Sequence, residues 1–149
     1  MEVKNKIPIC TPVKKELMVI TSKFGVTRMI PGYPHPKTHW GIDIGVTVDT
    51  DGFAAAGGRI TRCSVDPTGY GKFMILHSYY EGTDWFFIYG HLNKFLASVN
   101  DEVNKGDLIC KTGNTGPIST GPHLHFEMSH TRQLTDRENC CVNPVEYFV

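Results

Sequence analysis

Long apolar runs, net charge and an ordered cysteine pattern are all missing from this 149-residue sequence. Its 15 Lys and Arg residues balance 15 Asp and Glu residues, which argues against a protein whose main task is to hold nucleic acid or an anionic membrane. No stretch approaches the roughly 18 apolar residues of a membrane-spanning helix, so we expect no transmembrane segment. Lysines interrupt the apolar runs of residues 1–20, so we also expect no signal peptide there.

The five cysteines form no recognisable framework, because their number is odd and no two of them stand in a CxxC pair. This argues against a regular set of disulfides and against a thiolate zinc site. We interpret them as buried, reduced thiols, which favours synthesis in a reducing cytoplasm, as for a phage product. One disulfide, for instance through Cys10, is left open.

Sustained helical periodicity is absent as well, and a series of short β-favouring runs takes its place. Turn sequences such as Asp51-Gly52 and Gly113-Asn114 separate these runs at intervals of about ten residues. The pattern predicts an all-β fold, with antiparallel β-sheets in one sandwich or barrel-like domain and long loops around a groove. The expected strands are residues 40–48, 58–65, 72–78, 85–91, 107–112 and 123–128.

The two ends of the chain carry weaker signals. Residues 1–20 are interpreted as an N-terminal lead-in segment, with an edge strand near residues 17–21, and residues 21–149 as the main domain. Residues 129–141 are polar and show no alternation, so we expect a surface loop there. A single helical turn is expected after Pro144.

Polar side chains gather on one face of the expected strand 40–48. Alternation with a period of two places His39 and Asp43 on one face and Trp40 on the opposite face, which we expect to form core. In an extended strand the Cα atoms of His39 and Asp43 would stand about 13 Å apart, near the limit for one metal ion. Gly41 allows a bend that brings them together. Alone, the pair is more typical of a solvated or capping arrangement.

His123 and His125 give a stronger signal. Residues i and i+2 of a strand project from one face about 6.5–7 Å apart, so one histidine can bind a metal while the other addresses the metal-bound water. Two histidines satisfied on a polar face are the alternative. Glu127 shares this face and either accepts a proton from one of them or is an exposed edge residue. His91 follows an apolar strand, and a lone histidine there is more often structural.

Together, His39, Asp43 and His125 supply two imidazoles and one carboxylate. This set is typical of catalytic zinc, with a fourth position left for water whose pKa the metal lowers toward neutrality. No HExxH sequence is present to provide a glutamate base. His123 and His91 therefore remain as candidates for the general base.

Three histidines fall outside these motifs. His77 ends the β-favouring run GKFMILH, so we expect it to have a hydrogen-bonded structural role. His35 and His130 stand in expected loops, where we expect them to be solvated. We assign none of the three to the site.

Three sequences in this order carry a resemblance: HWGID at 39–43, YGHL at 89–92 and GPHLHFE at 121–127. They resemble the M23 family of zinc metallopeptidases, the lysostaphin- and LytM-like endopeptidases of bacterial cell walls. SKFGVTR, GYGKFMILH and VNKGDLICKTGNTG match as well, so the resemblance spans roughly residues 20–149. It implies one zinc ion per chain, held by His39, Asp43 and His125, and catalytic histidines at His91 and His123.

The resemblance also implies individual roles. His123 is our first choice for the base that activates water and His91 for stabilising the oxyanion, and an exchange of these roles is left open. Tyr33 matches a tyrosine that assists the transition state in lysostaphin-like members, with an aromatic lid residue as the alternative. Arg28 matches an arginine near the site, or else tethers a loop.

We therefore expect a zinc-dependent endopeptidase that hydrolyses peptide bonds in bacterial peptidoglycan, in stem peptides or in cross-bridges. Its partner would be the peptidoglycan peptide rather than nucleic acid, and we favour a monomer. Such an enzyme would act at the bacterial cell wall, as a phage lysin, a virion component or a piece of an exported protein. The alternative is a non-catalytic M23-like scaffold or regulator of wall hydrolases. Purely structural zinc is weaker still, because structural sites usually have four protein ligands.

Overall fold

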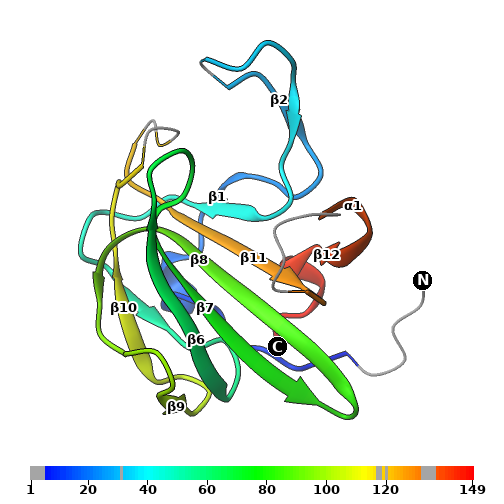
Figure 1. Ribbon diagram of the computed structural model, residues 1–149, viewed down its shortest axis with the longest axis vertical. Coiled ribbons are helices and arrows are strands. Elements are labelled where there is room, and N and C mark those ends of the chain that lie inside the picture. The colour runs from blue at the N-terminus through cyan, green and yellow to red at the C-terminus, as the bar shows by residue number, and fades with distance from the viewer. Residues whose placement is uncertain (1–5, 31, 117–118, 120, 132–136) are drawn as a thin grey trace.

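A computed structural model describes residues 6–30, 32–116, 119, 121–131 and 137–149. Its body is a twisted sheet in which neighbouring strands run in the order β1-β4-β11-β8-β7-β6-β9, with β5, β10 and β12 attached beside this path (Figure 1). All pairings between the strands are antiparallel, so the expected all-β fold is confirmed. The strands are β1 (Ile20–Ser22), β2 (Thr27–Arg28), β3 (Lys37–Thr38), β4 (Ile42–Ile44), β5 (Asp51–Phe53), β6 (Gly58–Asp66), β7 (Gly71–Tyr80), β8 (Thr83–Phe95), β9 (Glu102–Val103), β10 (Leu108–Thr112), β11 (Leu124–Ser129) and β12 (Cys141–Val142).

Helical structure in the described ranges amounts to three short turns: η1 (Lys15–Leu17), α1 (Arg137–Cys140) and η2 (Pro144–Glu146). The turn expected after Pro144 is thus confirmed, and the side chain of Asn143 caps it by accepting from the Val145 amide at 3.2 Å. None of these helices is long and apolar enough to cross a membrane.

The long strands β7 and β8 form the central hairpin of the sheet. Tyr80 pairs with Thr83, so only Glu81 and Gly82 form the turn, and both have positive φ, at 46° and 83°. Two central residues with positive φ define the turn whose twist matches that of antiparallel strands. This turn fixes the register that carries His91 to the end of β8 nearest the candidate site.

The core lies against one face of this sheet and draws on both ends of the chain. Ile7, Ile9 and Val13 are buried, and Ile9 pairs with Phe148 in an isolated parallel bridge. The described part of the expected lead-in therefore packs into the same core as the main body. The expected edge strand is present as β1, which lies at the end of the sheet and pairs with β4.

Two local expectations were wrong. Strand 40–48 is reduced to the three residues of β4, because the chain bends at Gly41 and leaves the extended conformation. The alternation fails with it, and Trp40 is half-buried against the edge of Phe24 instead of lying in the core. In the expected surface loop 129–141, β11 extends to Ser129 and α1 forms a helical turn, while residues 132–136 lie outside the described part.

A separate hairpin of β2 and β3 rises above one end of the main sheet (Figure 1). Its pairing continues past β3, because His39 donates its amide to the Val26 carbonyl at 2.8 Å and accepts from the Gly25 amide at 2.7 Å. The hairpin thus ends on His39, two residues before the chain bends at Gly41 and enters β4. This connection holds the hairpin above the site.

All five cysteines are unpaired in the structure, as expected. Only Cys110 is fully buried, and burial raises the pKa of its thiol to about 12. Cys10, Cys63, Cys140 and Cys141 are half-buried, so the expectation of burial holds fully for one residue in five.

Candidate metal centre and catalytic site

His39, Asp43 and His125 meet at one point, where the hairpin joins the main sheet. The Nε2 atom of His39 lies 3.2 Å from Nδ1 of His125 and 3.2 Å from Oδ1 of Asp43. That same carboxylate oxygen lies 3.0 Å from Nδ1 of His125. All three residues are buried, with at most 6% of their surface exposed. The bend at Gly41 therefore does what the sequence predicted, since it brings the two ends of HWGID together.

The close approach also depends on what Gly41 lacks. A Cβ atom there would stand 2.6 Å from both the Glu127 Cγ atom and the Phe126 carbonyl oxygen, which real Cβ atoms essentially never do. Asp43 and His125 are direct cross-strand partners in the β4–β11 pair. A side chain at position 41 would push these strands apart and separate the two residues.

The second nitrogen of each ring fixes which atoms face the meeting point. Nδ1 of His39 lies 3.2 Å from the Lys23 carbonyl oxygen, and Nε2 of His125 lies 2.7 Å from Oε1 of Glu127. Each of these oxygens can only accept, so the ring protons lie on the far side. In the neutral rings, two imidazole lone pairs and a carboxylate oxygen then face one another.

The lone pairs of these two nitrogens and one oxygen, 3.0–3.2 Å apart, would repel one another with nothing between them. A metal ion at the meeting point would attract all three. Zinc bound tetrahedrally at about 2.0–2.1 Å holds neighbouring ligand atoms about 3.3 Å apart. The donor chemistry and spacing therefore suit zinc.

The Asp43 carboxylate has titratable or charged partners at both of its oxygens. Burial alone would raise the pKa of its carboxyl, but when the facing nitrogens of His125 and His39 are protonated, as in the absence of a metal ion, their hydrogen bonds and charges outweigh burial and hold this pKa well below its usual range. Its second oxygen accepts from Nη1 of Arg28 at 3.0 Å, and the same Nη1 donates to Oγ of Ser22 at 2.9 Å. Arg28 thus joins β2 to the carboxylate beneath it.

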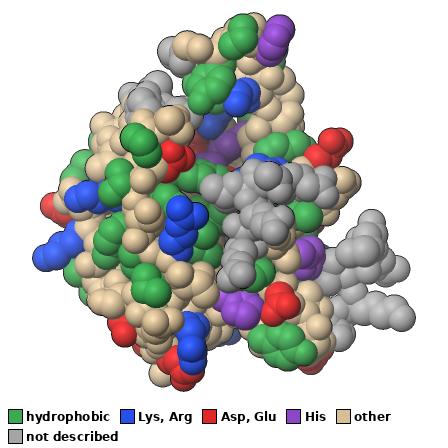
Figure 2. All heavy atoms as spheres, viewed as in Figure 1, with side chains coloured by type: hydrophobic (Ala, Val, Ile, Leu, Met, Phe, Trp, Pro, Cys, Tyr) green, Lys and Arg blue, Asp and Glu red, His purple; other side chains and the backbone are tan. Residues whose placement is uncertain are grey.

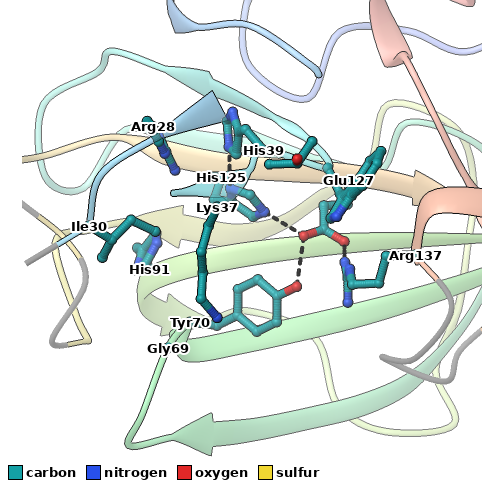
Figure 3. Close-up of a pocket in the computed structure, with 12 residues that line it drawn as sticks. Arg28, Ile30, Lys37, His39, Gly69, Tyr70, His91, His125, Glu127 and Arg137 are labelled. Atoms are coloured by element: carbon teal, nitrogen blue, oxygen red, sulfur yellow. Dashed lines mark hydrogen bonds and ion pairs between the residues drawn. The ribbon is translucent and has the colours of Figure 1, made fainter. Parts of the chain in front are cut away.

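A second network supports His125 from the opposite side. Oε1 of Glu127 accepts from His125 and also from the hydroxyl of Tyr70, each at 2.7 Å, and its other oxygen forms an ion pair with Nη2 of Arg137 (Figure 3). Glu127 is 3% exposed, so it is a buried partner of a ligand and not an exposed edge residue. A carboxylate that holds the far nitrogen of a ligand histidine fixes both its tautomer and its orientation.

The two other motif histidines lie beside the ligands. His123 places Nε2 at 3.6 Å from Oδ1 of Asp43, and the rings of His123 and His91 stand 4.7 Å apart. Nδ1 of His123 donates to the Gly121 carbonyl and Nδ1 of His91 to the Thr115 carbonyl, both at 2.7 Å. Both rings therefore present an acceptor Nε2 when neutral.

His91 carries two further marks of a special position. Burial lowers its pKa to about 4, with smaller contributions from His125 and His123, so the ring is neutral at pH 7. Its φ is 60°, a left-handed conformation that is uncommon outside glycine and clusters at functional sites.

A cavity of about 430 Å³ opens beside this cluster, with His91 in its lining and with His123 and Asp43 outside the lining. Its lining includes His39, His91 and His125 together with the network around Glu127, and Figure 3 shows these side chains directed into it. In Figure 2, histidine side chains lie in the hollow between the hairpin and the body of the molecule. The site thus combines a ligand set, two adjacent proton acceptors and room for a substrate segment.

The family model of Peptidase family M23 matches residues 37–137, which contain every motif histidine of this site. The chain belongs to the M23 family. This confirms the resemblance drawn from HWGID, YGHL and GPHLHFE.

Curated relatives of this M23 domain include peptidases of the cell wall. It is 34% identical to an uncharacterized metalloprotease of Haemophilus influenzae over 78% of the chain and 23% of the relative. It is 30% identical to the peptidoglycan DD-endopeptidase ShyA of Vibrio cholerae over 73% of the chain and 24% of the relative. The chain thus spans about a quarter of the length of these relatives.

Among solved structures, the catalytic domain of lysostaphin from Staphylococcus simulans superposes with a TM-score of 0.74 at 26% identity. The match covers 87% of this chain and 91% of that one. A zinc-containing peptidase from Vibrio cholerae superposes with a TM-score of 0.72 at 27% identity, over 83% of this chain and 37% of that one.

The expected position of Tyr33 in the M23 site stays a prediction. Tyr33 is half-buried in the hairpin loop, where the ammonium group of Lys37 lies 4.1 Å above its ring, and it is not part of the cavity lining.

The remaining histidines of the M23 domain divide as follows. His77 has the expected structural role, with Nε2 2.7 Å from Asp84 and its ring stacked on Phe86. His35 is exposed, as expected. His130 was expected to be solvated but is half-buried, with its ring 4.2 Å from that of Trp85.

Sequence reasoning missed three residues of the cavity: Lys37, Tyr70 and Arg137. The signal for Tyr70 was its place in the matched GYGKFMILH, between two glycines. Lys37 stands two residues before His39 and so on the same side of an extended segment. For Arg137 the sequence offered no signal, because it stands in a polar stretch without pattern.

Proposed function

We propose that this chain is a zinc-dependent endopeptidase that hydrolyses peptide bonds in bacterial peptidoglycan, in stem peptides or in cross-bridges. The observation that carries the proposal is the convergence of His39, Asp43 and His125 on one point, with the acceptor nitrogens of two more histidines beside it. Membership of M23 and relatives named as peptidoglycan endopeptidases support the same substrate. The enzyme would then act at the bacterial cell wall.

His39, Asp43 and His125 would hold the zinc ion. When bound, zinc supplies a Lewis acid that activates water and polarises the scissile carbonyl. Glu127 holds the His125 ring in the tautomer that leaves Nδ1 free for the metal, and Tyr70 and Arg137 hold Glu127. Arg28 keeps the Asp43 carboxylate in place through its second oxygen.

The proton is handled by His123 and His91. His123 is the first choice for the general base, because its acceptor Nε2 lies 3.6 Å from Oδ1 of Asp43. Its Nδ1 stays bonded to the Gly121 carbonyl, so the proton taken up resides on Nε2, from which it can pass to the leaving amine.

The role of His91 follows from its hydrogen bond to Thr115. A neutral His91 offers an acceptor at Nε2, and it becomes an oxyanion donor only when protonated, which burial disfavours. Either role places a proton on Nε2, so we keep His91 as the proposed oxyanion-stabilising residue and leave an exchange of roles with His123 open. Tyr33 remains proposed as a phenol donor to the oxyanion, with an aromatic lid residue as the alternative.

The experiment that tests this function combines metal content with product identity. Purified protein should contain about one zinc ion per chain, His125→Ala should lose it, and His123→Ala should keep it. His77→Gln is the matched control, since it alters a histidine that lies on β7 and bonds to Asp84. Digestion of peptidoglycans with different cross-links, followed by mass spectrometry of the new termini, would name the bond. Zinc binding without cleavage of any of them would favour the scaffold alternative.

A further inference from the structure

Two like charges face each other in the hairpin above the metal ligands. Arg28, in β2, and Lys37, in β3, are direct cross-strand partners, and both line the cavity. Like charges directly opposite each other destabilise an antiparallel pair. In a hairpin whose strands have only two residues each, that cost falls on the smallest sheet of the molecule. An anion close to both side chains would offset this cost.

The other cations of the cavity already have carboxylate partners. Arg28 bonds to Asp43, and Arg137 forms its ion pair with Glu127. Lys37 has no carboxylate within ion-pair distance among the described residues. Its ammonium group rests on the Tyr33 ring, a contact that holds the charge without neutralising it. Lys37 is thus the cation available to a ligand.

The local charge balance points the same way. Three cations, Arg28, Lys37 and Arg137, stand against two carboxylates, Asp43 and Glu127, which leaves one positive charge before any metal ion is counted. The whole chain has a formal net charge of zero. The positive excess is therefore a property of the cavity and not of the protein surface as a whole.

The position of Lys37 limits where that ligand group can lie. Lys37 and His39 are two residues apart on the extended arm of the hairpin, so their side chains leave it on the same side, about 6.5–7 Å apart at their origin. A peptide chain covers this distance in about two residues. The anion would thus lie within two residues of a bond positioned at the metal ligands.

We propose that Lys37 binds a free carboxylate of the substrate, one or two residues from the scissile bond, and so selects acidic peptides over neutral ones. This specificity rests on the proposed peptidase function and refines it. Lys37 would be a specificity residue, since it contacts the substrate but takes no part in the transfer of protons. The ring of Tyr33 would hold the ammonium group of Lys37 over the cavity.

A matched pair of substrates tests this. Cross-linked peptide dimers of the kind found in peptidoglycan are synthesised with the carboxyl group next to the cross-link either free or converted to a carboxamide. Wild-type protein should cleave the free acid with a kcat/KM about tenfold higher, as expected for a hydrogen bond between charged groups. The preference should fall with rising salt, because the pair is partly exposed.

Three variants localise the effect to one side chain. Lys37→Gln should abolish the preference by raising KM for the free acid to the value for the carboxamide, and Lys37→Arg should restore most of it. Lys105→Gln, which removes an exposed lysine elsewhere, is the control and should keep the preference. Zinc content and unfolding temperature, measured for each variant, verify that the fold is intact.

The outcomes separate the two proposals. Equal cleavage of acid and carboxamide by wild-type protein overturns the role of Lys37 and leaves the peptidase function standing. A preference that survives in Lys37→Gln also overturns it. Failure to cleave either dimer or whole peptidoglycan, in protein with a full complement of zinc, overturns the proposed function together with this specificity.

Discussion

The two walls of the cavity are built in contrasting ways. One wall is β11, in which all six residues are buried and which lies between β4 and β8. The other is the β2–β3 hairpin, in which exposed and half-buried residues alternate over two residue pairs. His125 stands in the first wall, and His39 stands where the second ends.

This difference separates two tasks. Metal ligands must be held to within a fraction of an ångström, and the buried wall does this with hydrogen bonds from several strands. Recognition of a variable peptide tolerates a thinner and more exposed element. We therefore expect changes in the buried wall to affect metal binding and catalysis, and changes in the hairpin to affect substrate preference.

The largest effect on the rate of hydrolysis should come from a substitution next to β11 that leaves His39, Asp43 and His125 in place. His123→Ala removes the proposed general base, so the rate of hydrolysis should fall about 10³-fold, within the range known for such groups. Zinc content should be unchanged, because His123 is not a ligand. Turnover by release of peptide termini and zinc by atomic spectroscopy measure the two quantities. Full activity in this variant would remove His123 from the mechanism.

The network behind His125 should govern metal affinity. Glu127→Ala leaves the His125 ring without its acceptor, and the zinc dissociation constant should rise about 10- to 100-fold. Glu127→Gln keeps an acceptor oxygen and should have a smaller effect, as should Tyr70→Phe, which removes one donor to Glu127. Competition with a chromogenic chelator gives the constants. Unchanged affinity in Glu127→Ala would mean that the buried wall holds the metal without this support.

The buried state of His91 should appear in the pH dependence of stability. Its pKa is about 4 in the folded protein and about 6.5 when unfolded, so between these values only the unfolded chain takes up the proton. Stability should therefore fall as the pH drops from about 6.5 to 4, by roughly 2 to 3 kcal/mol, and be unaffected by this group above pH 7.

His91→Asn should lack this component, and asparagine tolerates the left-handed backbone of this position. Urea unfolding at pH 7 and pH 4.5, with the metal chelated, gives the stability that each protein loses between the two pH values. The contribution of His91 is the loss in wild-type protein minus the loss in His91→Asn. If wild-type and variant lose the same stability between these pH values, His91 is not held neutral by burial.

The smallest effect should come from the hairpin. Tyr33→Phe keeps the ring under Lys37, so the preference for the acid over the carboxamide dimer should change by less than about threefold, whereas Tyr33→Leu removes the ring and should reduce that preference about two- to fivefold. Steady-state kinetics on the acid and carboxamide dimers measure this. The Tyr33→Phe variant also tests the proposed phenol donor, because loss of an oxyanion donor should slow turnover of both dimers about 100-fold. Unchanged turnover would remove the phenol from the transition state and leave Tyr33 as an aromatic residue of the hairpin.

The convergence of His39, Asp43 and His125 was predictable because these residues lie in short motifs whose spacing has a geometric meaning. A glycine between His39 and Asp43 and the i, i+2 spacing of His123 and His125 gave the local signals, and the order of the motifs, which resembles the M23 family, joined them into one site. The same reasoning placed Trp40 wrongly, since strict alternation holds only while the strand stays extended, and the bend that joins the ligands ends it.

Other parts of the site could not be predicted from local pattern. Tyr70 and Glu127 stand 57 residues apart in sequence and meet through the pairing of β8 with β7 and β11. Arg137 reaches Glu127 from a helical turn too short to show periodicity. The cross-strand pair of Arg28 and Lys37 likewise depends on a register that two-residue strands do not reveal.

The absence of a side chain at position 41 would help to set the size of the metal ion that the site can hold. With no methyl group to hold β4 away from β11, the donor atoms approach to 3.0–3.2 Å, which suits metal–ligand bonds near 2 Å. Calcium, with six to eight oxygen ligands at about 2.3–2.6 Å, requires a wider and more oxygen-rich cage. One absent carbon atom would thus favour zinc over calcium at this site.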